Sequence, residues 1–132
     1  MTSSGKIRSV NYATPEIKPS EFPDVDILIP TYGEPEYIVE RTIVGALNID
    51  YPDKSKIHIF LCDDSHRDSL KKMASGFKIN YLSRKDNVDK KAGNLNNALK
   101  KAKSPYILTL DADMSPKKDI LLRLVPFFID EK

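Results

Sequence analysis

The chain has 132 residues, of which 40% are hydrophobic and 30% are charged, and its net charge is +2. These values are typical of one globular domain with a sizeable core. No stretch of the sequence is strongly basic, as nucleic-acid-binding domains are, so we expect no nucleic-acid partner. The single cysteine, Cys62, excludes an internal disulfide and an all-cysteine zinc site. Residues 1–10 are polar, and no apolar run is long enough to span a membrane, so we predict neither a signal peptide nor a transmembrane segment.

Predicted strands and helices alternate along the chain. Residues 1–24 are polar and contain three prolines, and we interpret them as an N-terminal arm before a domain of residues 25–132. Apolar runs predict strands at 25–30, 57–62 and 106–110, and an alternating pattern predicts one at 78–82. Apolar stripes and end signals predict helices at 35–48, 67–75 with Gly76 just past the end, 92–103, and from Ser115-Pro116 onward with a kink or end at Pro126. The third strand is the most polar, which favours a place at the edge of the sheet.

This alternation predicts an α/β fold, a Rossmann-like and mainly parallel sheet of about four strands with helices on both faces. The loops after parallel strands meet at one edge of the sheet, which is where open α/β sheets bind ligands. No glycine-rich dinucleotide motif or P-loop follows the first strand, so a nucleotide would be held by side chains and a metal.

The fourth predicted strand, which we expect to be buried, ends at Asp111-Ala112-Asp113. In extended backbone, residues i and i+2 project to the same side, so the two carboxylates would emerge together. Two hard oxygen donors suit Mg²⁺ or Mn²⁺. Taken alone, the same stretch also fits a turn or a helix cap.

Polar groups also follow the other predicted strands. Asp63 or Asp64 could accept an N–H from a base, Tyr32 could pack on the base or ribose, and Lys90 or Lys91 could meet a phosphate. Each group has an ordinary alternative: core packing for the tyrosine, a strand-to-helix turn for the aspartates, and a solvated pair for the lysines. Asn94, in the turn that follows, has the alternative of capping a helix. The clustering of these polar groups at one edge of the sheet is stronger evidence for a ligand site than any single residue.

Four motifs occur in order along the chain: Pro30-Thr31-Tyr32-Gly33-Glu34, Leu61-Cys62-Asp63-Asp64-Ser65, Lys91-Ala92-Gly93-Asn94-Leu95-Asn96 and Leu110-Asp111-Ala112-Asp113. This series resembles the successive motifs of processive family-2 glycosyltransferases, the cellulose-synthase-like group, from about Val25 to the C-terminus. The resemblance implies a nucleotide-diphospho-sugar transferase fold and inverting transfer from a UDP-sugar to a growing polysaccharide or another acceptor. It implies that the parent enzyme lies in the cell membrane with this domain on the cytoplasmic side, and that this chain by itself is soluble.

The resemblance also implies a set of site residues. The implied substrate-binding residues are Thr31, Tyr32, Glu34, Asp63, Asp64, Lys91, Asn94 and Asp111. The implied ligands of the metal, Mg²⁺ or Mn²⁺, are Asp111 and Asp113.

The sequence departs from the family in ways that bear on activity. The family's Thr-Glu-Asp motif, which carries the catalytic base, and its Gln-x-x-Arg-Trp motif are absent, and the chain has no tryptophan. Met114 stands where some members have a histidine, which puts a third protein ligand to the metal in doubt. We therefore assign no catalytic residue, expect the base downstream of this chain, and predict donor binding without sugar transfer by this chain alone.

Two other functions compete with this interpretation. One is a non-catalytic binding or assembly module with a vestigial nucleotide site, which would self-associate through an exposed sheet edge. The other is a nucleotidyltransferase or phosphosugar enzyme of similar topology, which the lack of a glycine-rich, arginine-containing loop after the first strand disfavours.

Overall fold

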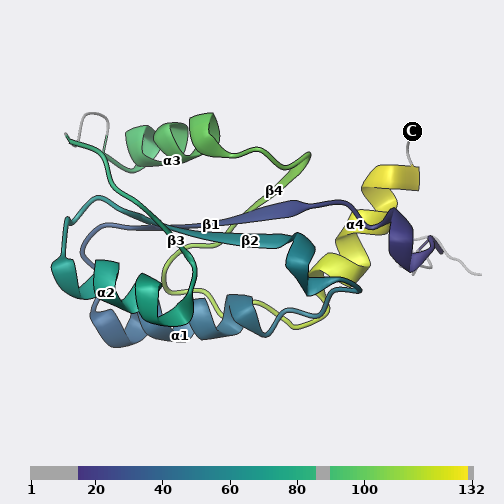
Figure 1. Ribbon diagram of the computed structural model, residues 1–132, viewed down its shortest axis with the longest axis horizontal. Helices are drawn as coiled ribbons and strands as arrows, with labels where there is room; N and C mark the ends of the chain where they lie inside the picture. The colour runs from purple at the N-terminus through teal and green to yellow at the C-terminus, as the bar shows by residue number, and fades with distance from the viewer. Residues whose placement is uncertain (1–14, 86–89, 131–132) are drawn as a thin grey trace, which may run out of the picture.

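The computed structural model describes residues 15–85 and 90–130. As predicted, these residues form a parallel four-stranded sheet with helices on both faces (Figure 1). The strands are β1 (Val25–Thr31), β2 (Ile57–Asp63), β3 (Asn80–Leu82) and β4 (Tyr106–Thr109), and their order in the sheet is β3-β2-β1-β4. The third strand therefore lies at an edge, as its polarity indicated.

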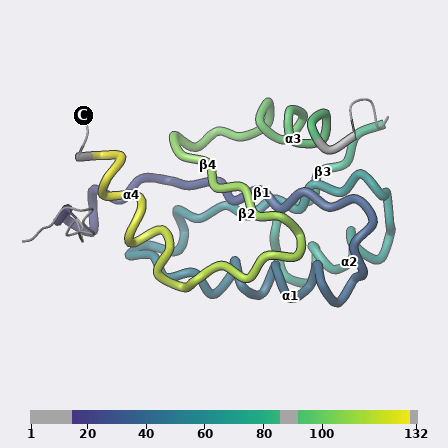
Figure 2. Tube along the Cα trace, turned by 180° about the vertical axis from the view of Figure 1, so that it is seen from behind, coloured from purple at the N-terminus to yellow at the C-terminus, as the bar shows by residue number. Residues whose placement is uncertain are grey.

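The helices are α1 (Glu36–Leu47), α2 (Asp68–Phe77), α3 (Lys90–Lys101) and α4 (Ile120–Asp130), with short 3-10 turns η1 (Pro19–Glu21) and η2 (Lys54–Lys56). Helices α1 and α2 cover one face of the sheet and α3 covers the other (Figure 1). Helix α4 lies near the end of the sheet at which β1 begins, as both views show (Figures 1 and 2). Within the described ranges, no helix has the length and apolar character that a membrane crossing needs.

The main core lies between the sheet and the pair α1 and α2. Alternate residues of β1 and β2, such as Ile27, Ile29 and Leu61, meet Ile43 and Leu70 from the helices there. A smaller core on the other face joins Leu28, Cys62 and Ala98. Strand β1 is buried along its whole length because it is paired on both sides and covered on both faces, which explains its nearly continuous apolar sequence.

Part of the predicted N-terminal arm is attached to this core, while residues 1–14 lie outside the described residues. Phe22 is buried and packs edge-on against Tyr51, with the ring centroids 5.3 Å apart. The Tyr51 hydroxyl donates to the Pro23 carbonyl at 2.5 Å. The boundary between arm and domain at residue 24 stays a prediction.

Strand β4 is not the fully buried strand that its apolar run indicated. It lies at the other edge of the sheet, and no strand within the described ranges pairs with its outer side. Its residues alternate between half-buried and exposed, and Ile107 is 41% exposed. An apolar run of this length does not distinguish an edge strand from a central one.

Two predicted helix ends are wrong. Helix α2 passes through Gly76 to Phe77, which packs against the core, and the left-handed residue at its end is Lys78 with φ of 60°. Helix α4 begins at Ile120 and not at Ser115, and it contains Pro126 without ending there. The segment before α4 runs along α1 instead, where the Asp50 N–H donates to the Lys118 carbonyl at 2.7 Å (Figure 2). A tertiary contact thus outweighs the Ser115-Pro116 start signal.

Candidate active site at the carboxyl edge of the sheet

The loops after β1 and β2 are joined where the two strands end. The parallel register pairs Thr31 with Asp63, the last residue of each strand. One residue further on, the Asp64 N–H donates to the Thr31 carbonyl at 3.0 Å. The predicted meeting of these loops at one edge is therefore confirmed.

The loop after β1 is organised by Glu34. Its Oε1 accepts a hydrogen bond from the Thr31 hydroxyl at 2.7 Å and another from the Tyr32 N–H at 2.9 Å. Burial opposes ionisation of Glu34, but these hydrogen bonds hold the pKa of its carboxyl below the usual value. The Tyr32 side chain is 50% exposed, so its ring is not part of the core and lies at the edge where a ligand could reach it.

Asp63 is completely buried, and both of its carboxylate oxygens are occupied by protein donors. Oδ1 accepts from the N–H of Ser65 at 2.8 Å and from the hydroxyl of the same residue. Oδ2 accepts from the Arg67 N–H at 3.0 Å and from the Tyr81 hydroxyl at 2.7 Å. Burial and this bond to a carboxylate raise the pKa of Tyr81 to about 12. Asp63 therefore holds the turn between β2 and α2 and ties it to β3.

Asp64 forms a two-pronged ion pair with Arg84. The guanidinium Nε lies 2.9 Å from Oδ1, and Nη2 lies 2.8 Å from Oδ2. A carboxylate as buried as this one, with a relative exposure of 2%, needs such a partner to remain charged. The pair places a carboxylate and a guanidinium side by side directly after β2.

The turn that follows Asp64 contains two further features. His66 is exposed and adopts a left-handed conformation with φ of 56°, which is uncommon for a residue other than glycine. The Arg67 Nε donates to the Ser65 hydroxyl at 2.8 Å, while its Nη2 is buried and is the one such side-chain donor or acceptor without a hydrogen-bond partner in the described part of the chain.

Asn94 is buried in α3 and links that helix to the sheet. Its side-chain Nδ2 donates to the Cys62 carbonyl at 2.8 Å, next to the predicted aspartate pair. Lys91 lies in the first turn of α3, but its side chain, like that of Lys90, is outside what the structure describes. The predicted phosphate contact by Lys91 therefore stays a prediction.

Asp111 and Asp113 lie in a turn directly after β4, and both are exposed. The turn is closed by the Met114 N–H, which donates to the Asp111 carbonyl at 2.9 Å, and by the Asp111 N–H, which points to the Met114 sulfur at 3.2 Å. Among the described residues, no group of three or more histidine, cysteine, aspartate or glutamate side chains is placed to hold a metal. Two exposed carboxylates match the share of ligands that a protein usually contributes to Mg²⁺ or Mn²⁺ beside phosphate and water.

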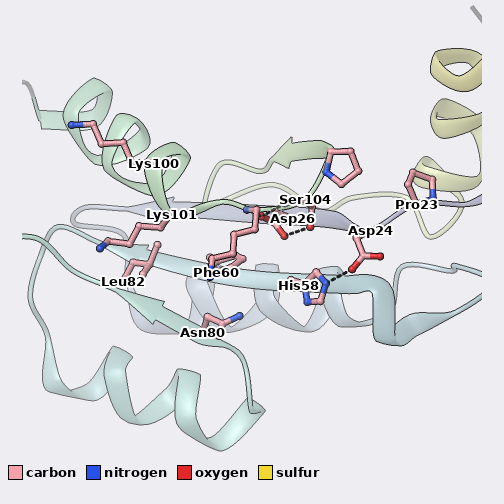
Figure 3. Close-up of a pocket in the computed structure, with 12 residues that line it drawn as sticks. Pro23, Asp24, Asp26, His58, Phe60, Asn80, Leu82, Lys100, Lys101 and Ser104 are labelled. Carbon is pink, nitrogen blue, oxygen red and sulfur yellow. Dashed lines mark hydrogen bonds and ion pairs between the residues drawn. The ribbon is translucent and has the colours of Figure 1, made fainter. Parts of the chain in front are cut away.

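A groove of about 1000 Å³ lies elsewhere, on the α3 face near the start of the strands (Figure 3). Its two aspartates are already used by the chain: Asp26 accepts from the Ser104 hydroxyl at 2.6 Å and from the Lys103 N–H at 2.9 Å, and Asp24 pairs with His58 at 2.9 Å. None of the site residues predicted from sequence lines the groove. We therefore place the candidate site at the carboxyl edge and not in this groove.

Three residues that contact the site were missed in the sequence. Arg84 stands in a charged loop and Tyr81 in a short strand. Thr42 stands within the apolar stripe of α1, and its hydroxyl lies 2.5 Å from the Ala112 carbonyl oxygen in the turn after β4. A hydroxyl amid the apolar stripe of a helix was the clearest available signal, because a buried polar group requires a hydrogen-bond partner. Nothing in the sequence identified the partners of Arg84 and Tyr81.

The fold is that of the A-type nucleotide-sugar transferases. The mannosyltransferase PcManGT from Pyrobaculum calidifontis, whose structure contains GDP-Man and Mn²⁺, matches with a TM-score of 0.69 and 24% identity over 88% of this chain and 34% of that one. The sequence profile described as glycosyl transferase family 2 matches residues 26–132, and the chain belongs to this family.

Relatives within the family include cellulose synthases. The cellulose synthase 1 catalytic subunit (UDP-forming) of Komagataeibacter xylinus is 43% identical over 103 residues, which is 78% of this chain and 14% of that protein. The cellulose synthase catalytic subunit (UDP-forming) of Xanthomonas axonopodis pv. citri (strain 306) is 39% identical over 110 residues, 83% of this chain and 15% of that protein. The chain is thus cellulose-synthase-like, and it spans about one-seventh of the length of these two relatives.

Proposed function

We propose that this chain is the donor-binding part of an inverting, metal-dependent glycosyltransferase. The enzyme would transfer a sugar from a UDP-sugar to a growing polysaccharide or another acceptor. The observation that carries the proposal is the meeting of two different groups of side chains at one sheet edge: the Asp64–Arg84 pair near Tyr32, and the carboxylates after β4. The names of the UDP-forming relatives support UDP as the nucleotide.

The base would be recognised by Asp64 and Arg84 together. The edge of uracil carries one N–H between two carbonyl oxygens, so it needs an acceptor flanked by donors. The carboxylate of Asp64 and the guanidinium of Arg84 supply both kinds of group, and the exposed ring of Tyr32 offers an aromatic surface at the same edge. Asp63, Asn94 and Glu34 would support this site, since their described hydrogen bonds hold its loops.

Asp111 and Asp113 would hold Mg²⁺ or Mn²⁺ on the diphosphate side. Glycosyl transfer leaves negative charge on the departing diphosphate, and a divalent cation stabilises that charge. Lys91 would add a positive charge on the same side. Mn²⁺ in the related mannosyltransferase structure supports the use of a divalent cation, and the two exposed carboxylates of this chain fit either ion.

We propose further that this chain binds donor without transferring sugar alone. Transfer requires a base that deprotonates the acceptor hydroxyl, and no Thr-Glu-Asp motif is present in the sequence. In the parent enzyme, which we propose is a membrane protein with this domain on the cytoplasmic side, a later segment would supply that base.

Titration of the chain with UDP, with and without Mn²⁺, tests the proposal through its nuclear magnetic resonance spectrum. We expect shifts at Tyr32 and Asp64 that strengthen with Mn²⁺. Asp111→Asn should remove the metal-dependent part, whereas Asp119→Asn, a matched change at an exposed aspartate just before α4, should not. Unchanged spectra at millimolar UDP would refute donor binding, and a wild-type Mn²⁺ response in Asp111→Asn would refute the metal assignment.

A second candidate function, an assembly module with a vestigial nucleotide site, is favoured by the exposed edge of β4. Ile107 is 41% exposed there, and on α4 Phe128, whose ring lies 6.0 Å from that of Tyr106, is 52% exposed. Sedimentation at two protein concentrations separates the functions. A dimer without any response to UDP would favour the assembly module.

A further inference from the structure

We propose that Thr42 of α1 is a positioning residue for the carboxylates of Asp111 and Asp113. This inference rests on the proposed metal site. It concerns a residue that lies about seventy positions earlier in the sequence and that touches neither the nucleotide nor the metal in the proposed function.

The Thr42 hydroxyl reaches two carbonyls in the turn after β4. Its Oγ1 lies 2.5 Å from the Ala112 carbonyl oxygen and 3.1 Å from that of Met114, and these two carbonyls flank Asp113 in the chain. It also lies 3.1 Å from the Ile38 carbonyl one turn earlier in its own helix. A hydroxyl has one proton to donate, and the shortest distance identifies Ala112 as the main acceptor.

Both partners of this hydrogen bond are buried, so its removal should be costly. Thr42 has a relative exposure of 0%, and Ala112 has one of 1%. The Ala112 carbonyl would lose its side-chain donor if the hydroxyl were removed, and a buried carbonyl without a partner is costly. The turn would then relax toward water or toward other donors, and the peptide that precedes Asp113 would rotate.

Two more contacts hold the following segment against α1. An added Cβ at Gly45 would lie 3.1 Å from the Pro116 side chain, so the absence of a side chain at this helix position permits the close approach. After the helix ends, the Asp50 N–H donates to the Lys118 carbonyl. The segment from Ala112 to Lys118 is therefore held by α1 at its beginning and middle and by Asp50, just after that helix, at its end, and it runs beside α1 in Figure 2.

Asp111 and Asp113 are both exposed and lie on the turn after β4. The backbone of this turn carries both carboxylates, and the buried Thr42 hydroxyl contacts that backbone on both sides of Asp113. Removing a group that orients metal ligands typically lowers metal affinity by about 10- to 100-fold. Helix α1 thereby acts on the metal side of the site although it supplies none of its ligands.

The test compares Thr42→Val, which keeps the shape and removes the hydroxyl, with Thr42→Ser, which keeps the hydroxyl. Mn²⁺ affinity is measured in the presence of UDP by electron paramagnetic resonance. We expect Thr42→Val to bind Mn²⁺ at least about tenfold more weakly, and Thr42→Ser to retain most of the wild-type affinity. Thr109→Val, at an exposed threonine two residues before Asp111, serves as the matched control and should bind as the wild type does.

Amide hydrogen exchange of residues 112–115 without metal gives a second readout. It should accelerate in Thr42→Val and not in Thr42→Ser. If wild-type protein binds no Mn²⁺, the proposed function fails while this exchange result still reports on the turn. Wild-type Mn²⁺ affinity in Thr42→Val would overturn the inference. If Thr42→Val does not fold, Thr42→Ala takes its place, and wild-type Mn²⁺ affinity in that variant would overturn the inference equally.

Discussion

Arg84 and Asp64 are joined by two parallel hydrogen bonds, from Nε to Oδ1 at 2.9 Å and from Nη2 to Oδ2 at 2.8 Å. The side chains are 12% and 1% exposed, so the pair is almost completely removed from water. It connects the segment after β3 to the end of β2. The candidate base-binding edge therefore depends on two loops whose positions are coupled by this ion pair.

Arg84→Met should destabilise the protein by about 3–5 kcal/mol, because it leaves the buried Asp64 carboxylate without its cation. Urea unfolding followed by circular dichroism measures the change. The double variant Arg84→Met/Asp64→Asn should recover part of the loss, since it also removes the buried charge. Arg84→Lys should remain destabilised, because an ammonium cannot form the two-pronged contact. A wild-type unfolding free energy in Arg84→Met would contradict this account of the pair.

Tyr81→Phe should lower the unfolding free energy by about 1–3 kcal/mol, since it removes a hydrogen bond to a charged, buried carboxylate. Asp63 would keep its bonds from Ser65 and Arg67, so the turn after β2 should loosen without unfolding. Tyr37→Phe is the control, because that side chain is 68% exposed. Equal stability of the two variants would show that the Tyr81 hydroxyl contributes nothing to the site.

Glu34 should make stability depend on pH in the acid range. Burial acts to raise its pKa, but hydrogen bonds from Tyr32 and Thr31 outweigh it, and the pKa falls below its usual value of 4.5. The folded pKa is thus below the unfolded one, so this stabilisation is fully present above about pH 4.5 and is lost as the pH falls through the folded pKa. Glu34→Gln should therefore destabilise the chain more at pH 7 than at pH 3. Glu40→Gln, an exposed change on α1, provides the comparison, and a Glu34→Gln effect of equal size at both pH values would argue against the prediction.

Cys62 should be unreactive in the folded protein. Burial raises the pKa of its thiol to about 12, and the nearby charge of Asp64 adds to that effect. The thiolate is the reactive form, so a disulfide reagent at pH 8 should label Cys62 much more slowly in the folded chain than in urea. Labelling at the same rate in both conditions would mean that the strand end opens readily.

The strands and their parallel arrangement were predictable because their signals are local. Apolar runs such as 25–30 and 57–62 specify strands, and the helices between them require parallel crossovers. The start of α4 was not predictable in this way. Ser115-Pro116 is a valid local signal, but the contacts of Pro116 with Gly45 and of Lys118 with Asp50 keep the segment extended along α1.

The site was predictable only in part, because several of its contacts join segments that are far apart in the sequence. The motifs indicated which strand ends hold polar residues, and the register of Thr31 with Asp63 confirms that the first two of these ends meet. Which residues support them was not evident. Arg84, Tyr81 and Thr42 belong to residue types that are usually solvated or packed in such positions, so their roles appear only when their partners are known.

The sequence by itself determined the family of this protein, the parallel sheet implied by its alternating elements, and the edge at which its carboxylates gather. Those features follow from local periodicity and from the spacing of short motifs. Only the tertiary structure decided how each carboxylate is used: Asp63 and Asp64 are buried and bound by Tyr81 and Arg84, while Asp111 and Asp113 remain exposed. A buried charge must find a partner, but the partner can come from any segment that the fold brings near, and residue spacing does not encode that choice.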